Sequence, residues 1–118
     1  MTPRALLAQA RELVERPVPG TEGLWARAAA HLARQALESA MRVRLARRTH
    51  RIEEVSFRVQ LLCLTLECDA AAAAQAAYAW SALSTALHHH GYELPPTARS
   101  LRAWVDAVER VVERLDRE

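Results

Sequence analysis

The chain has 118 residues, of which 51% are hydrophobic and 25% charged, a balance that excludes a disordered segment and predicts one folded domain spanning residues 1–118. The net charge is only +2, and all the basic residues are arginines. Residues 1–59 carry 11 arginines against 6 acids, whereas residues 60–118 carry 5 against 8. This asymmetry favours either contact with a polyanion through the basic half or pairing of a basic face with an acidic one.

The first two helices are expected over residues 3–16 and 23–48. Thr2 is the expected N-cap of the first helix, with a proline in its first turn. The second helix has small residues on one face, which would let a neighbouring helix approach closely. A further edge of this helix, which we interpret as solvated or ligand-facing, carries Arg27, His31, Arg34, Glu38 and Arg42.

Three more helices are expected over residues 54–67, 69–90 and 97–117. The helix over 54–67 is apolar around much of its circumference, so we expect it to be the most buried one. Val55, Phe57 and Val59 also alternate, which leaves a short strand as the minor alternative. Five helices with short connections predict an all-α, antiparallel up-and-down bundle of four to five helices.

Three consecutive histidines, His88, His89 and His90, stand where the helix over 69–90 is expected to end. Side chains of consecutive helical residues point about 100° apart, so these rings cannot all bind one metal ion while the helix persists. We expect His90 to pack inward. His88 or His89 is a candidate general acid or base for phosphodiester cleavage, with Tyr92 and Glu93 beside it as binding residues. The alternative is a purely structural corner.

A second candidate site is a basic cluster at the end of the helix over 23–48. Arginine forks bind phosphate bidentately, so the cluster suits RNA or nucleotide phosphate. The alternative is a solvated helix end, where cations are favourable in any case. The cluster consists of Arg42, Arg44, Arg47, Arg48, His50 and Arg51.

Several classes of protein are disfavoured by the absence of their motifs. The chain has no phosphate-binding glycine loop, no nucleophile-elbow motif and no paired-histidine zinc motif. Cys63 and Cys68 are unsuitably spaced for a disulfide within a helix and form no complete zinc pattern. We therefore expect no cofactor, no metal, no membrane contact and a cytoplasmic location, since neither a signal peptide nor an apolar span is evident.

Parts of the chain resemble small HEPN-like helical proteins of high-GC bacteria. The resemblance is carried by residues 80–84, by the segment from His88 to Thr97, and by Leu101–Trp104. Residues 34–38 resemble the second-helix pattern of the wider HEPN superfamily and of the substrate-binding partners of nucleotidyltransferases. The resemblance implies a four- to five-helix bundle, a homodimer, and association with RNA, nucleotides or a nucleotidyltransferase-like protein.

Many HEPN proteins are metal-independent ribonucleases, often toxins, in which four to six residues separate an arginine from a histidine in a late helix at the dimer interface. This chain departs from that motif, because residues 69–90 contain no arginine. Arg44 and His50 have the required spacing but fall at the end of the second helix. We therefore expect a module that binds RNA, nucleotide or a protein partner rather than a standard HEPN nuclease. The alternatives are a toxin-like ribonuclease acting at a dimer interface and an adaptor without a ligand site.

Overall fold

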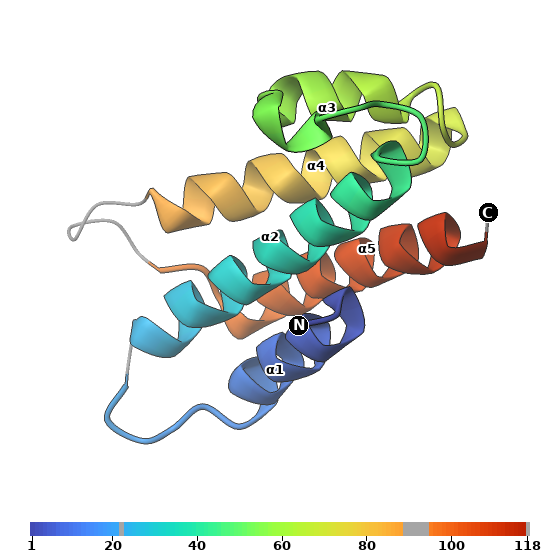
Figure 1. Cartoon of the computed structure of the whole chain (residues 1–118). Coiled ribbons are helices and arrows are strands. Elements are labelled where there is room, and N and C mark those ends of the chain that lie inside the picture. The colour runs from blue at the N-terminus through green and yellow to red at the C-terminus, as the bar shows by residue number, and fades with distance from the viewer. Residues whose placement is uncertain (22, 89–94, 118) are drawn as a thin grey trace.

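The computed structural model describes residues 1–21, 23–88 and 95–117, and within these residues the chain is helical and contains no strand. The short strand left open at Val55–Val59 is therefore wrong. Within the described residues, five α-helices and one turn of 3-10 helix follow one another along the chain (Figure 1). They are α1 (Pro3–Glu15), α2 (Leu24–Leu45), η1 (Ile52–Glu54), α3 (Phe57–Leu64), α4 (Ala70–Leu87) and α5 (Ala98–Arg117).

Local capping chemistry explains where the helices begin. Thr2 accepts a hydrogen bond from the Ala5 amide at 3.1 Å, and Asp69 accepts one from the Ala72 amide at 2.8 Å. Thr97 accepts one from the amide of Ser100 at 3.0 Å. Each side-chain oxygen satisfies a backbone N–H that has no partner within the first turn of its helix. These starts agree with the positions that the sequence predicts.

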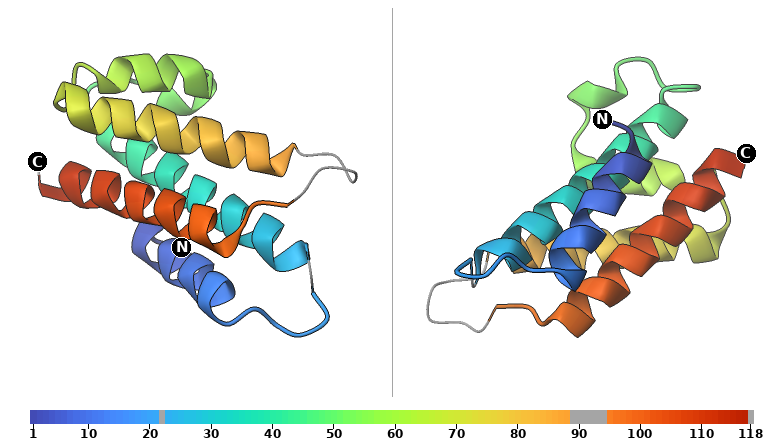
Figure 2. Two further views of the ribbon diagram at one scale, coloured as in Figure 1. Left: turned by 180° about the vertical axis from the view of Figure 1, so that it is seen from behind. Right: turned by 90° about the horizontal axis from the view of Figure 1, so that it is seen from below.

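Helix α2 runs through the middle of the molecule and packs on α1, α4 and α5 (Figure 2). Its inward face is built from small side chains, so these three neighbours approach it closely. Larger side chains from α2, α4 and α5, such as Leu37, Leu83 and Val108, fill the remaining core and are fully buried. The buried alanines of α2 are Ala26, Ala29, Ala30, Ala33, Ala36 and Ala40.

Helix α3 corrects the expectation of a long and deeply buried helix over 54–67. The 3-10 turn η1 occupies the predicted first residue, so α3 begins only at Phe57, after its N-cap Ser56, and it ends at Leu64. Only Gln60 and Leu64 of this helix are buried. The other four helices build most of the core, so α3 packs mainly on α2 and α4 and exposes apolar side chains to solvent (Figure 1). Leu62 is 69% exposed, and Leu66, just beyond the helix, is 83% exposed.

Ion pairs join α1 to α5 on the side of the molecule away from α3. Arg11 of α1 contacts Asp106 at 2.8 Å and also pairs with Glu109, both from α5. Burial by itself lowers the pKa of Arg11, but hydrogen bonds to the two carboxylates and their charges raise it by more, so the net pKa lies above its ordinary value. Arg11 therefore stays charged and holds the two helices together.

The two cysteines are half-buried beside the core rather than within it, and Cys68 Sγ donates to the Leu64 carbonyl at 3.4 Å. None of the helices in the described part of the chain combines the length and apolar character that crossing a bilayer requires.

Candidate functional site

A solvent-accessible groove of about 640 Å³ lies between the first half of α2 and the end of α4. Its polar lining is wholly basic among the residues that the structure describes, and its apolar lining comes from Leu24, Ala28 and Leu87. The four basic residues of the groove are Arg27, His31 and Arg34 from α2 and His88 from α4.

Helical geometry explains how α2 contributes three basic side chains to one wall. Residues three and four positions apart in a helix lie on the same face, so Arg27, His31 and Arg34 form one stripe. Arg27 and His31 are exposed, whereas Arg34 is half-buried where α4 approaches. The stripe belongs to the edge interpreted from the sequence as solvated or ligand-facing, and these three residues were not among the predicted binding residues.

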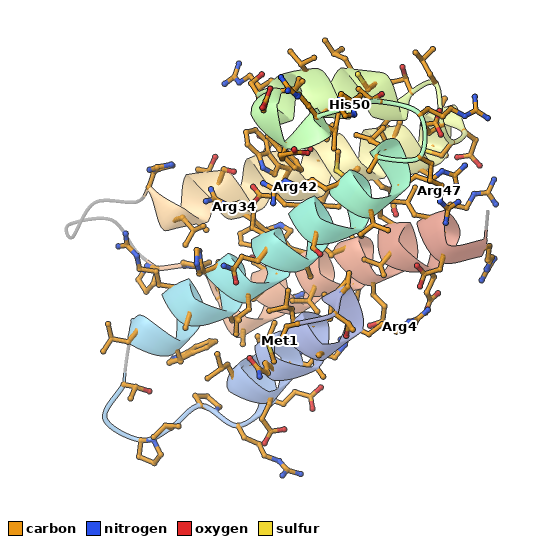
Figure 3. The ribbon with its side chains drawn as sticks, in the orientation of Figure 1. Met1, Arg4, Arg34, Arg42, Arg47 and His50 are labelled. Carbon is orange, nitrogen blue, oxygen red and sulfur yellow. The ribbon has the colours of Figure 1, made fainter. Side chains whose placement is uncertain are left out.

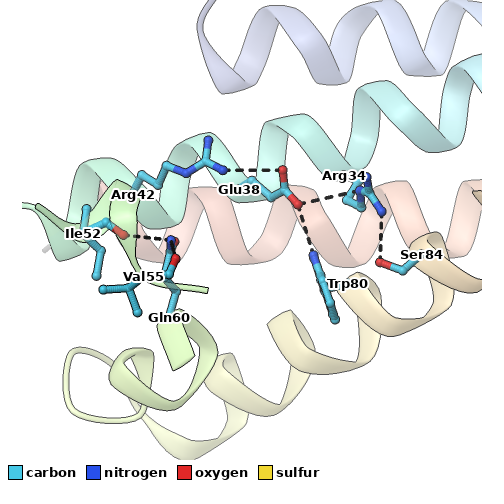
Figure 4. Close-up of polar contacts among 8 residues, drawn as sticks. All are labelled: Arg34, Glu38, Arg42, Ile52, Val55, Gln60, Trp80 and Ser84. Carbon is cyan, nitrogen blue, oxygen red and sulfur yellow. Dashed lines mark hydrogen bonds and ion pairs between the residues drawn. The ribbon is translucent and has the colours of Figure 1, made fainter. Parts of the chain in front are cut away.

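Arg34 is held in place by a small polar network between α2 and α4 (Figure 4). Its Nη1 atom donates to Ser84 Oγ at 3.3 Å, and its Nε atom lies 3.7 Å from Glu38 Oε2. The indole of Trp80 donates to the same Glu38 oxygen at 3.2 Å. The other oxygen of Glu38 faces Arg42, 3.8 Å from its Nη2 atom. Glu38 is thus shared by two arginines and offsets only part of their charge.

His88 ends α4 and belongs to the opposite wall of the groove. Its backbone N–H reaches the carbonyls of Ser84 and Thr85, which makes it the C-cap residue, and its side chain is exposed. The structure thus places His88, one residue of the predicted histidine site, in the same groove as Arg27 and Arg34. His89, His90, Tyr92 and Glu93 fall outside the described residues.

Arg44 belongs to the fold rather than to a surface cluster. The residue is only 9% exposed, and its guanidinium lies between the end of α2, the turn before α4 and the last turns of α5. Its Nε atom is 3.4 Å from Glu67 Oε1, and its Nη groups donate to the carbonyls of Glu67 and Leu115 at 3.1 and 3.4 Å. A phosphate group cannot reach a guanidinium enclosed in this way without local unfolding.

The other members of the predicted basic cluster are exposed, and Figure 3 shows three of them, Arg42, Arg47 and His50, at separate places. Arg48 pairs with Glu67 at 3.5 Å, and Arg51 pairs with Glu54 at 3.9 Å. Arg51 also adopts a left-handed backbone conformation with φ 57°. Arg42 stands in the last turn of α2, and its contact with Glu38 places it on the edge that leads to the groove. The cluster is therefore not one continuous site.

The groove has the chemistry of an anion site. Guanidinium groups offer paired donors to phosphate, and imidazole can donate a hydrogen bond or transfer a proton. The apolar wall offers contact to an uncharged part of the same ligand. A metal centre is not indicated in the described part of the chain, where no three histidine, cysteine or acidic side chains gather suitably.

Comparisons of the chain with protein-family models, with curated proteins and with solved structures find no match.

Proposed function

We propose that this protein is a helical module that binds the phosphate of RNA or of a nucleotide in the groove between α2 and α4. One observation carries the proposal: Arg27, His31, Arg34 and His88 line a single groove to which no described acidic side chain contributes. A group with several negatively charged oxygens complements this lining. A nucleobase or ribose has a place against Leu24, Ala28 and Leu87. The fold proposed for this module is an HEPN-like antiparallel bundle.

The partial burial of Arg34 strengthens this reading, because the side chain is already ordered before a ligand arrives. Ser84 and Glu38 hold the guanidinium, so binding costs less conformational entropy than it would for a mobile surface arginine. Water is also partly excluded there, and a charge-assisted hydrogen bond is stronger in such surroundings. Arg27 and His31 are exposed and can adjust to the ligand.

The direct test is binding of a fluorescently labelled oligouridylate, followed by anisotropy. Arg27→Glu reverses one charge of the groove at an exposed position. Hydrogen bonds to charged groups contribute about 1.5–3 kcal/mol, so we expect affinity to fall by about tenfold or more. Arg117→Glu is the matched control, because it makes the same charge change at an exposed position at the far end of α5 (Figure 1). Equal losses in both variants, or none in either, would reject the groove as the binding site.

A ribonuclease is the second candidate, favoured by the presence of two imidazoles in a groove that also holds two arginines. One histidine would take the proton of the ribose 2′-hydroxyl while the other gives a proton to the leaving 5′-oxygen, and the arginines would stabilise the phosphorane-like charge. The second histidine would be His31, which sequence reasoning did not select. Arg44, buried against Glu67, is not available as the arginine of a standard HEPN motif.

The test of this activity is cleavage of RNA with a chelator present. His31→Ala and His88→Ala should each abolish cleavage and leave RNA binding within severalfold of wild type. His50→Ala is the control, since His50 is also exposed but does not line the groove. Cleavage that survives in both groove variants removes the catalytic assignment and leaves the binding function standing.

A further inference from the structure

The basic edge of α2 continues beyond the groove. Arg42 does not line the groove, yet its position in the helix places it on the same stripe as Arg27 and Arg34. In Figure 3 the labelled side chains of Arg34 and Arg42 follow one another along α2, and Arg47 lies beyond the C-terminal end of this helix. At 1.5 Å per residue, the distance along the helix from position 27 to position 42 is about 22 Å. A single phosphate group therefore cannot contact Arg27 and Arg42 together.

Arg34 and Arg42 both pair with Glu38 but keep hydrogen-bond donors for a ligand. The ion pairs of Arg34 and Arg42 with Glu38, at 3.7 and 3.8 Å, are longer than hydrogen bonds. Glu38 instead accepts its hydrogen bond from the Trp80 indole, and its side chain is only 19% exposed. Arg42 is 48% exposed, so its guanidinium faces solvent as well as the carboxylate. The edge therefore presents cations outward and keeps its one acid inward.

We propose that the ligand is a single-stranded nucleic acid whose phosphates follow α2 from the groove to Arg42, so that Arg42 forms a second phosphate subsite. This inference rests on the proposed function, and it specifies that the ligand is a polymer that covers a defined length of α2. At the 3.4 Å spacing of a stacked strand, 22 Å corresponds to about seven nucleotides. The apolar wall formed by Leu24, Ala28 and Leu87 favours a strand with bases over a bare chain of phosphates.

The test measures binding of 5′-phosphorylated oligouridylates of two, four, six, eight and twelve nucleotides to wild type, Arg27→Gln and Arg42→Gln. Uridine monophosphate, oligothymidylate, inorganic polyphosphate and polyglutamate serve as competitors. For single strands, the slope of the logarithm of affinity against the logarithm of salt concentration changes by about −0.7 per phosphate contact. One contact therefore contributes about fourfold in affinity at about 0.15 M salt. Arg117→Gln is the matched charge control on α5.

The expected result is affinity that rises up to about seven nucleotides and then levels off. Arg42→Gln should weaken the octanucleotide about fourfold and leave the dinucleotide unchanged, whereas Arg27→Gln should weaken both. Several results would overturn the inference: no dependence on length, equal losses for short and long strands in Arg42→Gln, or stronger competition by polyphosphate or polyglutamate than by oligonucleotide. If neither mononucleotide nor octanucleotide binds, the proposed function fails as well. Binding of mononucleotide without a length dependence rejects only the extended footprint.

Discussion

The substitution Arg44→Ala tests whether the arginines at the end of α2 hold the fold together or bind a ligand. Arg44 and Glu67 have side chains that are only 10% and 8% exposed and lie 3.4 Å apart. Two unit charges at that distance attract by about 5 kcal/mol at an effective dielectric constant of about 20, and the cost of desolvating them offsets much of this. The net effect of the substitution is set by the carboxylate that it leaves behind.

Removing one partner of a buried ion pair costs about 3–5 kcal/mol, because the other charge stays buried without compensation. Glu67 keeps one partner in the variant, since Arg48 lies 3.5 Å from its second oxygen. We therefore expect Arg44→Ala to lower the free energy of unfolding by about 3 kcal/mol. For a chain of 118 residues this corresponds to a fall in Tm of about 12 °C.

The assay is urea and thermal unfolding followed by circular dichroism, with Arg48→Ala as the matched control. Arg48 faces the same carboxylate but is 76% exposed, so its loss should cost less than about 1 kcal/mol. Adding Glu67→Leu to Arg44→Met should leave the protein more stable than Arg44→Ala, because no unpaired charge is buried. If Arg44→Ala is as stable as Arg48→Ala but binds RNA far more weakly, the assignment of Arg44 to the fold is wrong.

Other expected outcomes can be measured by the same unfolding experiments. Leu37→Ala removes a fully buried side chain and should cost about 3–5 kcal/mol, whereas Leu66→Ala, at an 83% exposed position, should change stability by less than about 0.5 kcal/mol; similar values for the two would contradict the packing. Asp69→Ala removes the cap of α4 and should cost about 1 kcal/mol, and an unchanged midpoint would show that the cap is dispensable. Arg51→Gly should gain up to about 1 kcal/mol, because glycine adopts φ 57° without steric cost; a loss would argue against the left-handed backbone there.

Local rules in the sequence were sufficient to predict most helix starts. Thr2, Asp69 and Thr97 each act within one turn of their own helix, and no tertiary contact is needed to recognise them. The helix predicted over 54–67 does form, as α3, but its predicted length and deep burial were wrong, because burial depends on tertiary contacts. Its apolar composition indicates burial only if a partner covers each face, and α3 meets α2 and α4 on one side alone.

The same distinction applies to the candidate site. Helical periodicity showed that Arg27, His31 and Arg34 share an edge, but it could not show what that edge faces. The sequence could not separate the members of the basic cluster near residue 47, because a buried arginine and an exposed arginine are the same residue type. The fold turns Arg44 inward to Glu67 and leaves Arg48 exposed.

The sequence by itself determined that the chain forms helices, where most of them begin, and which side chains lie along one edge of α2. These properties depend on backbone geometry and on contacts within a few residues. Only the tertiary structure decided that His88 faces this edge across a groove and that Arg44 forms a buried ion pair with Glu67. Both outcomes depend on how α2, α4 and α5 pack against one another, and packing is settled by the whole core rather than by any one segment.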